Sequence, residues 1–265
     1  MTVNQVLSAK VASAHTGQSL SGTRDPILGT LASTVSDLET VRISLSNRLF
    51  SLTHDEHDLD GVLRAYGLPE DDPSVLAVKE LLEGAQGLER AAVRALEKRM
   101  KNHVLYPWVE ANKGVGAKST ARLLASIGDP YIKELYVEEE WHQYRHVYKP
   151  RTVAELWSYC GYGVVDGKAP KRTQGLKLNW NPEARKRVWL IAETSVKCNG
   201  TYKPVYDAAK EAALATVHQQ DCHRCKVKAG EPLTAGHAHA RALRRVSKEI
   251  LRDLWLLSKE WHEKN

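Results

Sequence analysis

The sequence predicts a mainly α-helical protein, because apolar residues recur every three or four positions along most of its 265 residues. The clearest case is the C-terminal segment, where six apolar residues at this spacing define one helical face: Leu243, Val246, Ile250, Leu254, Leu257 and Trp261. Two further stripes of similar length lie in the N-terminal third of the chain. A chain of this length can bury a sizeable core or form two unequal domains.

The two N-terminal stripes predict a helical hairpin over residues 26–107, preceded by a mobile, polar leader at residues 1–25. The first stripe begins after Pro26 and contains Leu31, Val35, Leu38, Val41, Leu45, Leu49 and Leu52. The second contains Leu81, Ala85, Leu88, Ala92, Leu96 and Met100. Two stripes joined by a polar segment can satisfy each other as antiparallel, coiled-coil-like helices. The same pattern also fits an arm that recruits another protein or associates with a second copy.

Residues 108–265 are expected to form a second helical domain. Helices are predicted over 117–127, 153–160, 182–197 and 202–218, besides the C-terminal one. Residues 163–179 contain three Gly and one Pro and predict an extended loop, whereas residues 131–150 have no clear period.

Composition limits the function classes. Lysine and arginine total 38 against 32 acidic residues, giving a net charge of +6, which permits but does not require a polyanionic partner. The N-terminus lacks the apolar core of a secretory signal, and no apolar run is long enough to span a membrane. Four cysteines are too few for a disulfide framework. We therefore expect a cytoplasmic protein.

A helix-hairpin-helix is predicted around Gly114-Val115-Gly116. The glycines permit a positive φ and a close approach of the backbone to DNA, while Val115 fills the space between the two helices. The N–H groups of the second helix can then bind a phosphate. The predicted DNA contacts are Lys113, Gly114, Val115, Gly116, Lys118 and Ser119. An ordinary tight turn between two helices would have the same pattern.

A basic segment extends this prediction. Seven cations lie between Asp166 and Leu190 against two acids, as neutralisation of phosphates requires. They are Lys168, Lys171, Arg172, Lys177, Arg185, Lys186 and Arg187. The alternative is a solvated surface loop. The C-terminal helix adds more cations on its polar side, among them Arg244 and Lys248.

A structural Zn²⁺ site is predicted in the loop at residues 219–239. Cys222 and Cys225 are separated by two residues, so both thiolates can face one ion, and His237 and His239 complete a tetrahedral set. Because two histidines two positions apart cannot share a helix face, we expect both in an extended segment before the last helix. His218 and His223 are alternative ligands. Four protein ligands leave no open position for catalysis.

The order of these elements resembles the C-terminal half of RNA-guided insertion-sequence transposases and of Piv-type DNA invertases, over roughly residues 75–262. The resemblance rests on Gly114-Val115-Gly116, on Ala121 to Pro130, on Leu156 to Tyr162, on Lys168-Ala169-Pro170-Lys171, on Asn181 to Arg187 and on Arg245 to Trp255. In that family a coiled coil also precedes the helix-hairpin-helix.

Two departures from the family lead to the expected function. Residues 1–74 are too short and too helical for the family's RuvC-like catalytic domain. In the stretch where the family has its nucleophilic serine, the only residue with a hydroxyl group is Thr173. We therefore expect no enzymatic activity, but a non-catalytic accessory factor of DNA recombination that binds DNA, a recombinase, or both. A recombination directionality factor acting on a phage serine integrase is one such protein. A stand-alone DNA-binding regulator and a divergent transposase are the alternatives.

Overall fold

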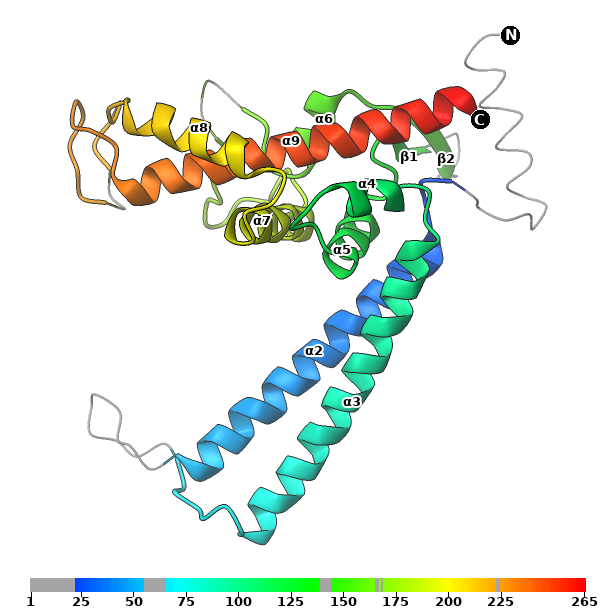
Figure 1. Ribbon diagram of the computed structural model, residues 1–265, viewed down its shortest axis with the longest axis vertical. Coiled ribbons are helices and arrows are strands. Elements are labelled where there is room, and N and C mark those ends of the chain that lie inside the picture. The colour runs from blue at the N-terminus through cyan, green and yellow to red at the C-terminus, as the bar shows by residue number, and fades with distance from the viewer. Residues whose placement is uncertain (1–21, 55–64, 139–143, 165–166, 168, 223–224) are drawn as a thin grey trace. The chain divides into compact units, whose positions relative to one another are not determined.

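The structure is a computed structural model that describes residues 22–54, 65–138, 144–164, 167, 169–222 and 225–265 (Figure 1). It is mainly helical, as predicted, and contains one two-stranded sheet in this part of the chain. The chain divides into two compact units, one of residues 27–99 and the other of residues 1–26 and 100–265. Most of the leader predicted at residues 1–25 lies outside the described residues. No described helix is long and apolar enough to cross a membrane.

The smaller unit is the predicted helical hairpin, formed by α2 (Pro26–Thr53) and α3 (Pro73–Lys101) (Figure 1). Val35 of α2 and Leu96 of α3 are fully buried, and Arg42 of α2 forms an ion pair with Glu89 of α3 at 2.5 Å. The predicted stripe on α3 is partly wrong, because its Leu81 and Leu88 are exposed. The face of α3 that the chain itself covers contains Val75, Val78, Leu82, Ala85, Glu89, Ala92 and Leu96, all buried or half-buried.

The larger unit is built around the C-terminal helix α9 (Ala235–Lys264). Helix α8 (Lys203–Leu214) lies alongside α9, which also packs against α6 (Val153–Tyr159) and α7 (Pro182–Lys197) (Figure 1). The predicted stripe is the buried face of α9, where its first four residues are completely inaccessible: Leu243, Val246, Ile250 and Leu254. Helix α5 (Ala117–Ile127) packs on α7 and on the short α4 (Tyr106–Ala111).

Strands β1 (Ile132–Glu138) and β2 (Tyr144–Pro150) form an antiparallel hairpin in the region without a clear period. Arg151, directly after β2, is buried and donates hydrogen bonds to the carbonyls of Ile127, Asp129 and Pro130. This guanidinium satisfies carbonyl groups at the C-terminal end of α5, which would otherwise lack donors. It thereby connects the β-hairpin to the helical core.

A buried carboxylate attaches the first described residues to the end of α9. Asp129 accepts hydrogen bonds from Thr23, from Ser258 at 2.7 Å and from the backbone N–H of Tyr131 at 2.7 Å, and it lies 2.5 Å from His262. Burial alone would raise the pKa of Asp129, but the hydrogen bonds from His262 and Thr23 outweigh it and lower the pKa below 3.8. The charged form therefore stabilises the fold.

Candidate metal centre and nucleic-acid interface

The two cysteines of the predicted metal site lie on a tight hairpin. The N–H of Cys222 donates to the carbonyl of Val227, and the N–H of Lys226 donates back to the carbonyl of Cys222, both at 2.8 Å. Lys226 adopts a positive φ of 60°, which closes the turn behind Cys225. This turn brings both thiols to the same side of the loop.

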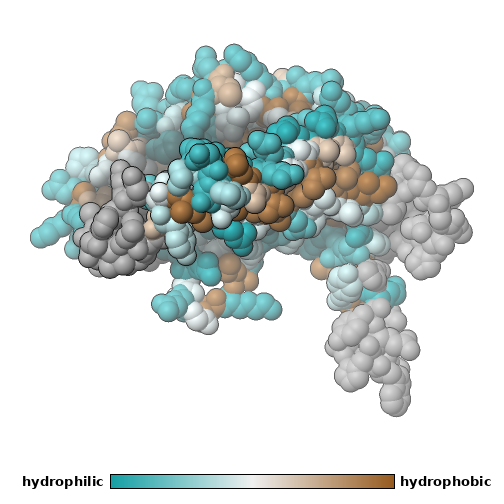
Figure 2. All heavy atoms as spheres, turned by 90° about the horizontal axis from the view of Figure 1, so that it is seen from below, coloured by the Kyte–Doolittle hydropathy of each residue, from teal (hydrophilic) through white to brown (hydrophobic). Residues whose placement is uncertain are grey.

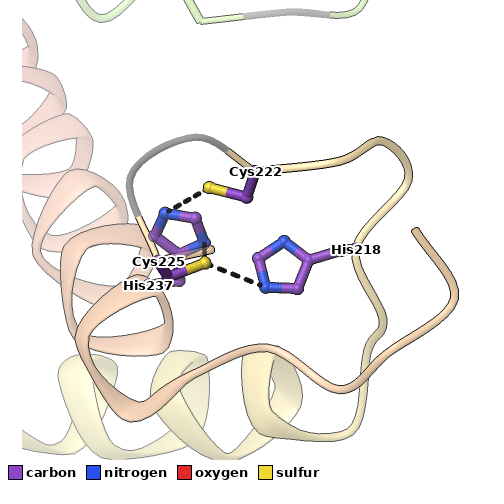
Figure 3. A group of neighbouring side chains, drawn as sticks. All are labelled: His218, Cys222, Cys225 and His237. Atoms are coloured by element: carbon purple, nitrogen blue, oxygen red, sulfur yellow. Dashed lines mark hydrogen bonds between the residues drawn. The ribbon is translucent and has the colours of Figure 1, made fainter. Parts of the chain in front are cut away.

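The two histidines of the site come from either side of the hairpin. The buried His218 lies where the chain leaves α8, and its backbone exchanges hydrogen bonds of 2.8 Å with Gly230 and Glu231. His237 lies in the first turn of α9, and its N–H is capped by the side chain of Thr234 at 3.4 Å. Local backbone pairing thus holds both imidazoles against the thiols (Figure 3).

The four side chains lie close enough together to bind one ion. Their ligand atoms all lie within 4.8 Å of one another. The Sγ of Cys222 is 3.6 Å from Nε2 of His237, and the Sγ of Cys225 is 3.5 Å from Nε2 of His218 (Figure 3). Bond lengths of about 2.3 Å to sulfur and about 2.0 Å to nitrogen give a tetrahedral S···N edge of about 3.5 Å. These residues could therefore hold a metal ion.

His239 was predicted as a ligand, but the structure brings His218 to the cluster in its place. The predicted extended segment for the histidine pair is also wrong, because helix α9 begins at Ala235 and contains both His237 and His239. Two positions correspond to about 200° around a helix, so the two rings point in different directions. His239 contacts Tyr206 of α8, with 2.7 Å between Nδ1 and the hydroxyl. His223 lies outside the described residues.

The other two cysteines lie apart from this cluster. Cys160 is completely buried, and burial raises the pKa of its thiol to about 12, so that it stays protonated and unreactive. Cys198 is exposed at the C-terminal end of α7.

The predicted helix-hairpin-helix is formed by α4, the turn at residues 112–116 and α5. Val115 is buried, as expected for the residue between the two helices. Gly114 has the predicted positive φ, at +85°, but Gly116 has a φ of −102° and serves as the N-cap of α5. No side chain caps this end of α5, and a Cβ at Gly116 would meet no atom within 4 Å. The N-terminal end of α5 is thus open at Gly116.

The other side of the turn packs tightly against the last turn of α7 and the segment that follows it. A Cβ on Gly114 would lie 2.8 Å from Cα of Ser195, and one on Gly200 would lie 2.1 Å from the carbonyl oxygen of Lys113. That oxygen accepts a hydrogen bond of 3.0 Å from the N–H of Thr201. The two glycines of the motif therefore differ, since Gly114 packs inside the protein and Gly116 faces outward.

The structure separates the residues predicted for the basic segment. Four are exposed: Lys171, Arg172, Lys177 and Lys186. Arg185 lies over the rings of Tyr162 and Trp180 and donates to the carbonyl of Pro170 at 3.4 Å. Arg187 is buried and paired with Glu183, which places it poorly for the predicted contact with DNA. Lys168 lies outside the described residues. Around the hairpin, Lys113 is exposed and Lys118 and Ser119 are half-buried.

Two cations of α9 join Arg185 in one group. Arg244 lies over the same ring of Tyr162 and donates to the carbonyls of Gly161 and Tyr162, and Lys248 lies 4.4 Å from the ring centre of Trp157. Burial and the charge of Arg185 lower the pKa of Arg244. Burial and the charge of Arg244 lower the pKa of Lys248.

Aromatic rings and backbone carbonyls, rather than carboxylates, thus hold these like charges together. Among the described residues, Arg185, Arg244 and Lys248 form no ion pair with an acid. We call these three residues the cation group.

Comparisons of this chain with protein-family models, with curated proteins and with solved structures find no match. The features of the structure that bear on function are the cluster of two cysteines and two histidines, the turn between α4 and α5, and the cation group.

Proposed function

We propose that this chain is a zinc-stabilised DNA-binding protein that acts as a non-catalytic accessory factor in DNA recombination. The observation that carries the proposal is the cation group, since it forms no ion pair with an acid among the described residues and adjoins the exposed Lys171 and Arg172 through the contact of Arg185 with Pro170. Uncompensated cations held close together favour a ligand that supplies several negative charges, such as a phosphate backbone.

The donor set at residues 218–237 supports zinc as the metal. Two thiolates and two imidazoles suit Zn²⁺ better than the oxygen-preferring Mg²⁺ or Ca²⁺. Four protein ligands complete the coordination shell, so the ion would hold the loop onto the start of α9 and would activate no water.

The open N-terminal end of α5 supports contact with the DNA backbone. Gly116 offers no side chain that would compete for the first N–H groups of the helix, and the exposed Lys113 lies beside the turn. Such groups bind phosphate oxygens and carry no information about base sequence. We therefore expect salt-sensitive binding with little sequence preference.

A role in recombination is supported by the resemblance of residues 75–262 to transposases and invertases of the insertion-sequence type. The proposed partner is a recombinase such as a phage serine integrase. The protein would control whether that enzyme integrates or excises DNA.

DNA binding is tested by fluorescence anisotropy with labelled duplex DNA at several salt concentrations. Replacing Lys171, Arg172 and Lys248 by alanine should remove up to three phosphate contacts and lower the salt slope by about 3. The matched control is Lys197→Ala, since Lys197 pairs with Glu193 on the exposed surface of α7. Equal affinities of the triple variant and the wild type would refute the proposed interface.

The recombination role is tested by a gel shift with integrase and its attachment-site DNA. A slower complex that requires both proteins supports an accessory factor. A shift on DNA alone that integrase leaves unchanged would refute this role and favour a stand-alone regulator.

A further inference from the structure

Helix α3 has a second apolar face, which is exposed in the part of the chain that the structure describes. Besides the face packed on α2, six small or apolar residues recur at alternating steps of four and three: Ala77, Leu81, Gly84, Leu88, Ala91 and Ala95. All six are exposed, and Leu81 and Leu88 expose 61% and 62% of their surface. Hydrophilic residues cover much of the face drawn in Figure 2, and hydrophobic residues gather there in patches. We call the six residues the outer seam.

The spacing of the outer seam is that of a coiled-coil core. Steps of four and three keep one side of a helix against a partner helix over several turns. The seam extends over five turns of a helix that α2 already supports on its other face. A partner would therefore meet a preformed surface.

Gly84 points to close approach by another helix. Glycine in a helix interior is less favourable than alanine, so it usually has a packing reason. Among the described residues there is none, because a Cβ at Gly84 would meet no atom of theirs within 4 Å. An absent side chain at the centre of an exposed seam leaves a recess that a large residue of a partner can fill.

We propose that the outer seam pairs with the same seam of a second copy of this chain, in antiparallel orientation. When the two-fold axis lies at the level of residue 86, Leu88 of one copy faces Gly84 of the other, and Leu81 faces Ala91. Every leucine then meets a small residue, so each of the four central layers contains one leucine and one glycine or alanine. A parallel pair would instead stack Gly84 on Gly84 and leave a gap.

Charge complementarity supports the same orientation. Glu80 and Arg94 flank the seam on one side, both are exposed, and neither forms an ion pair within the described part of the chain. In the antiparallel register Glu80 of each copy faces Arg94 of the other, which gives two equivalent ion pairs. In a parallel register the residue that faces Glu80 would be Ala85, which has no charge.

This inference does not depend on the proposed DNA-binding function. It is tested by sedimentation equilibrium of the full-length protein over a range of concentrations. We expect a reversible monomer–dimer equilibrium. Leu81→Glu combined with Leu88→Glu should raise the dimer dissociation constant by about 100-fold or more, because it places carboxylates in an apolar interface. The matched control is Phe50→Glu, because Phe50 is an equally exposed apolar residue of α2, and this variant should dimerise like the wild type.

Charge reversal tests the orientation. Glu80→Arg and Arg94→Glu should each weaken the dimer, and the two together should restore it. Circular dichroism should show equal helix content in every variant, since all the altered side chains are exposed. A wild type that stays monomeric at all concentrations, or a seam variant that dimerises unchanged, would overturn the proposal. Failure of the double charge reversal to restore the dimer would overturn the antiparallel orientation.

Discussion

Replacing one histidine at a time distinguishes the metal ligands from their neighbours. His218→Ala removes a buried imidazole whose Nε2 lies 3.5 Å from the thiol of Cys225. His239→Ala removes an imidazole that contacts the hydroxyl of Tyr206. The two variants make the same chemical change within 21 residues of each other, so each serves as the control for the other.

The expected loss of zinc affinity in His218→Ala follows from dividing the free energy of zinc binding equally among four ligands. Structural zinc sites contribute about 10–16 kcal/mol, so one ligand of four accounts for about 3 kcal/mol, or roughly a 100-fold loss of affinity. His239→Ala should leave zinc affinity unchanged and cost about 1 kcal/mol of folding stability through its lost hydrogen bond.

The assay is a competition titration with a chromophoric zinc chelator, together with hydrogen exchange. The wild type and His239→Ala should bind one zinc per chain, and His218→Ala should lose the ion to the chelator. Removal of zinc should expose the amides of residues 216–234, because the apolar cluster beside them is small and consists of Ala213, Leu233 and Ala238. Zinc loss in His239→Ala but not in His218→Ala would refute the ligand assignment.

Two further predictions concern stability. Gly114→Ala should destabilise the protein by about 2–4 kcal/mol, because it combines a positive φ with a 2.8 Å approach to the backbone of Ser195, whereas Gly116→Ala should cost no more than about 1 kcal/mol. Urea unfolding measures both, and equal losses would contradict the inward and outward roles of the two glycines. Asp129 has a lowered pKa, so its carboxylate contributes full stability above pH 3.8, and this contribution is lost as the pH falls through its folded pKa. Asp129→Asn should be less stable by about 2–3 kcal/mol at neutral pH, because it leaves His262 beside an uncharged amide. As the pH is lowered, its melting temperature should also fall less steeply than that of the wild type. Parallel profiles of melting temperature against pH for the two proteins would show that another group causes the loss of stability in acid.

Helices were predictable from the sequence wherever one face of the helix is buried. The C-terminal stripe from Leu243 to Trp261 has a period that only a helix produces, and the helix follows it. The β-hairpin was not predictable, because β1 alternates Ile132, Glu134 and Tyr136 on one face with Lys133, Leu135 and Val137 on the other. Each face mixes apolar and charged residues, so neither a period of two nor one of 3.6 stands out.

The cysteine pair was predictable from its spacing, but the choice of histidines depended on where α9 begins. Because Thr234 caps the helix, His239 turns toward α8, and the vacant position goes to His218, four residues before Cys222. The spacing His218-x3-Cys222-x2-Cys225 was the signal that could have identified this ligand. As long as the start of α9 was unknown, His218 and His239 were equally suitable, because either one completes a set of two thiolates and two imidazoles.

The cation group explains why charge counts along the sequence were a poor guide to the interface. Arg187 lies within the densest basic run, yet its partner Glu183 is one helical turn away and cancels its charge. Arg244 lies about 60 residues further along the chain and comes next to Arg185 only because α9 packs against α7, and Lys248 follows Arg244 by one turn of α9. Aromatic rings can hold cations in place without neutralising them, whereas a carboxylate removes the net charge. The residues that best fit a polyanion are therefore those that lie over Tyr162 and Trp157, and they could be recognised only after folding brought them together.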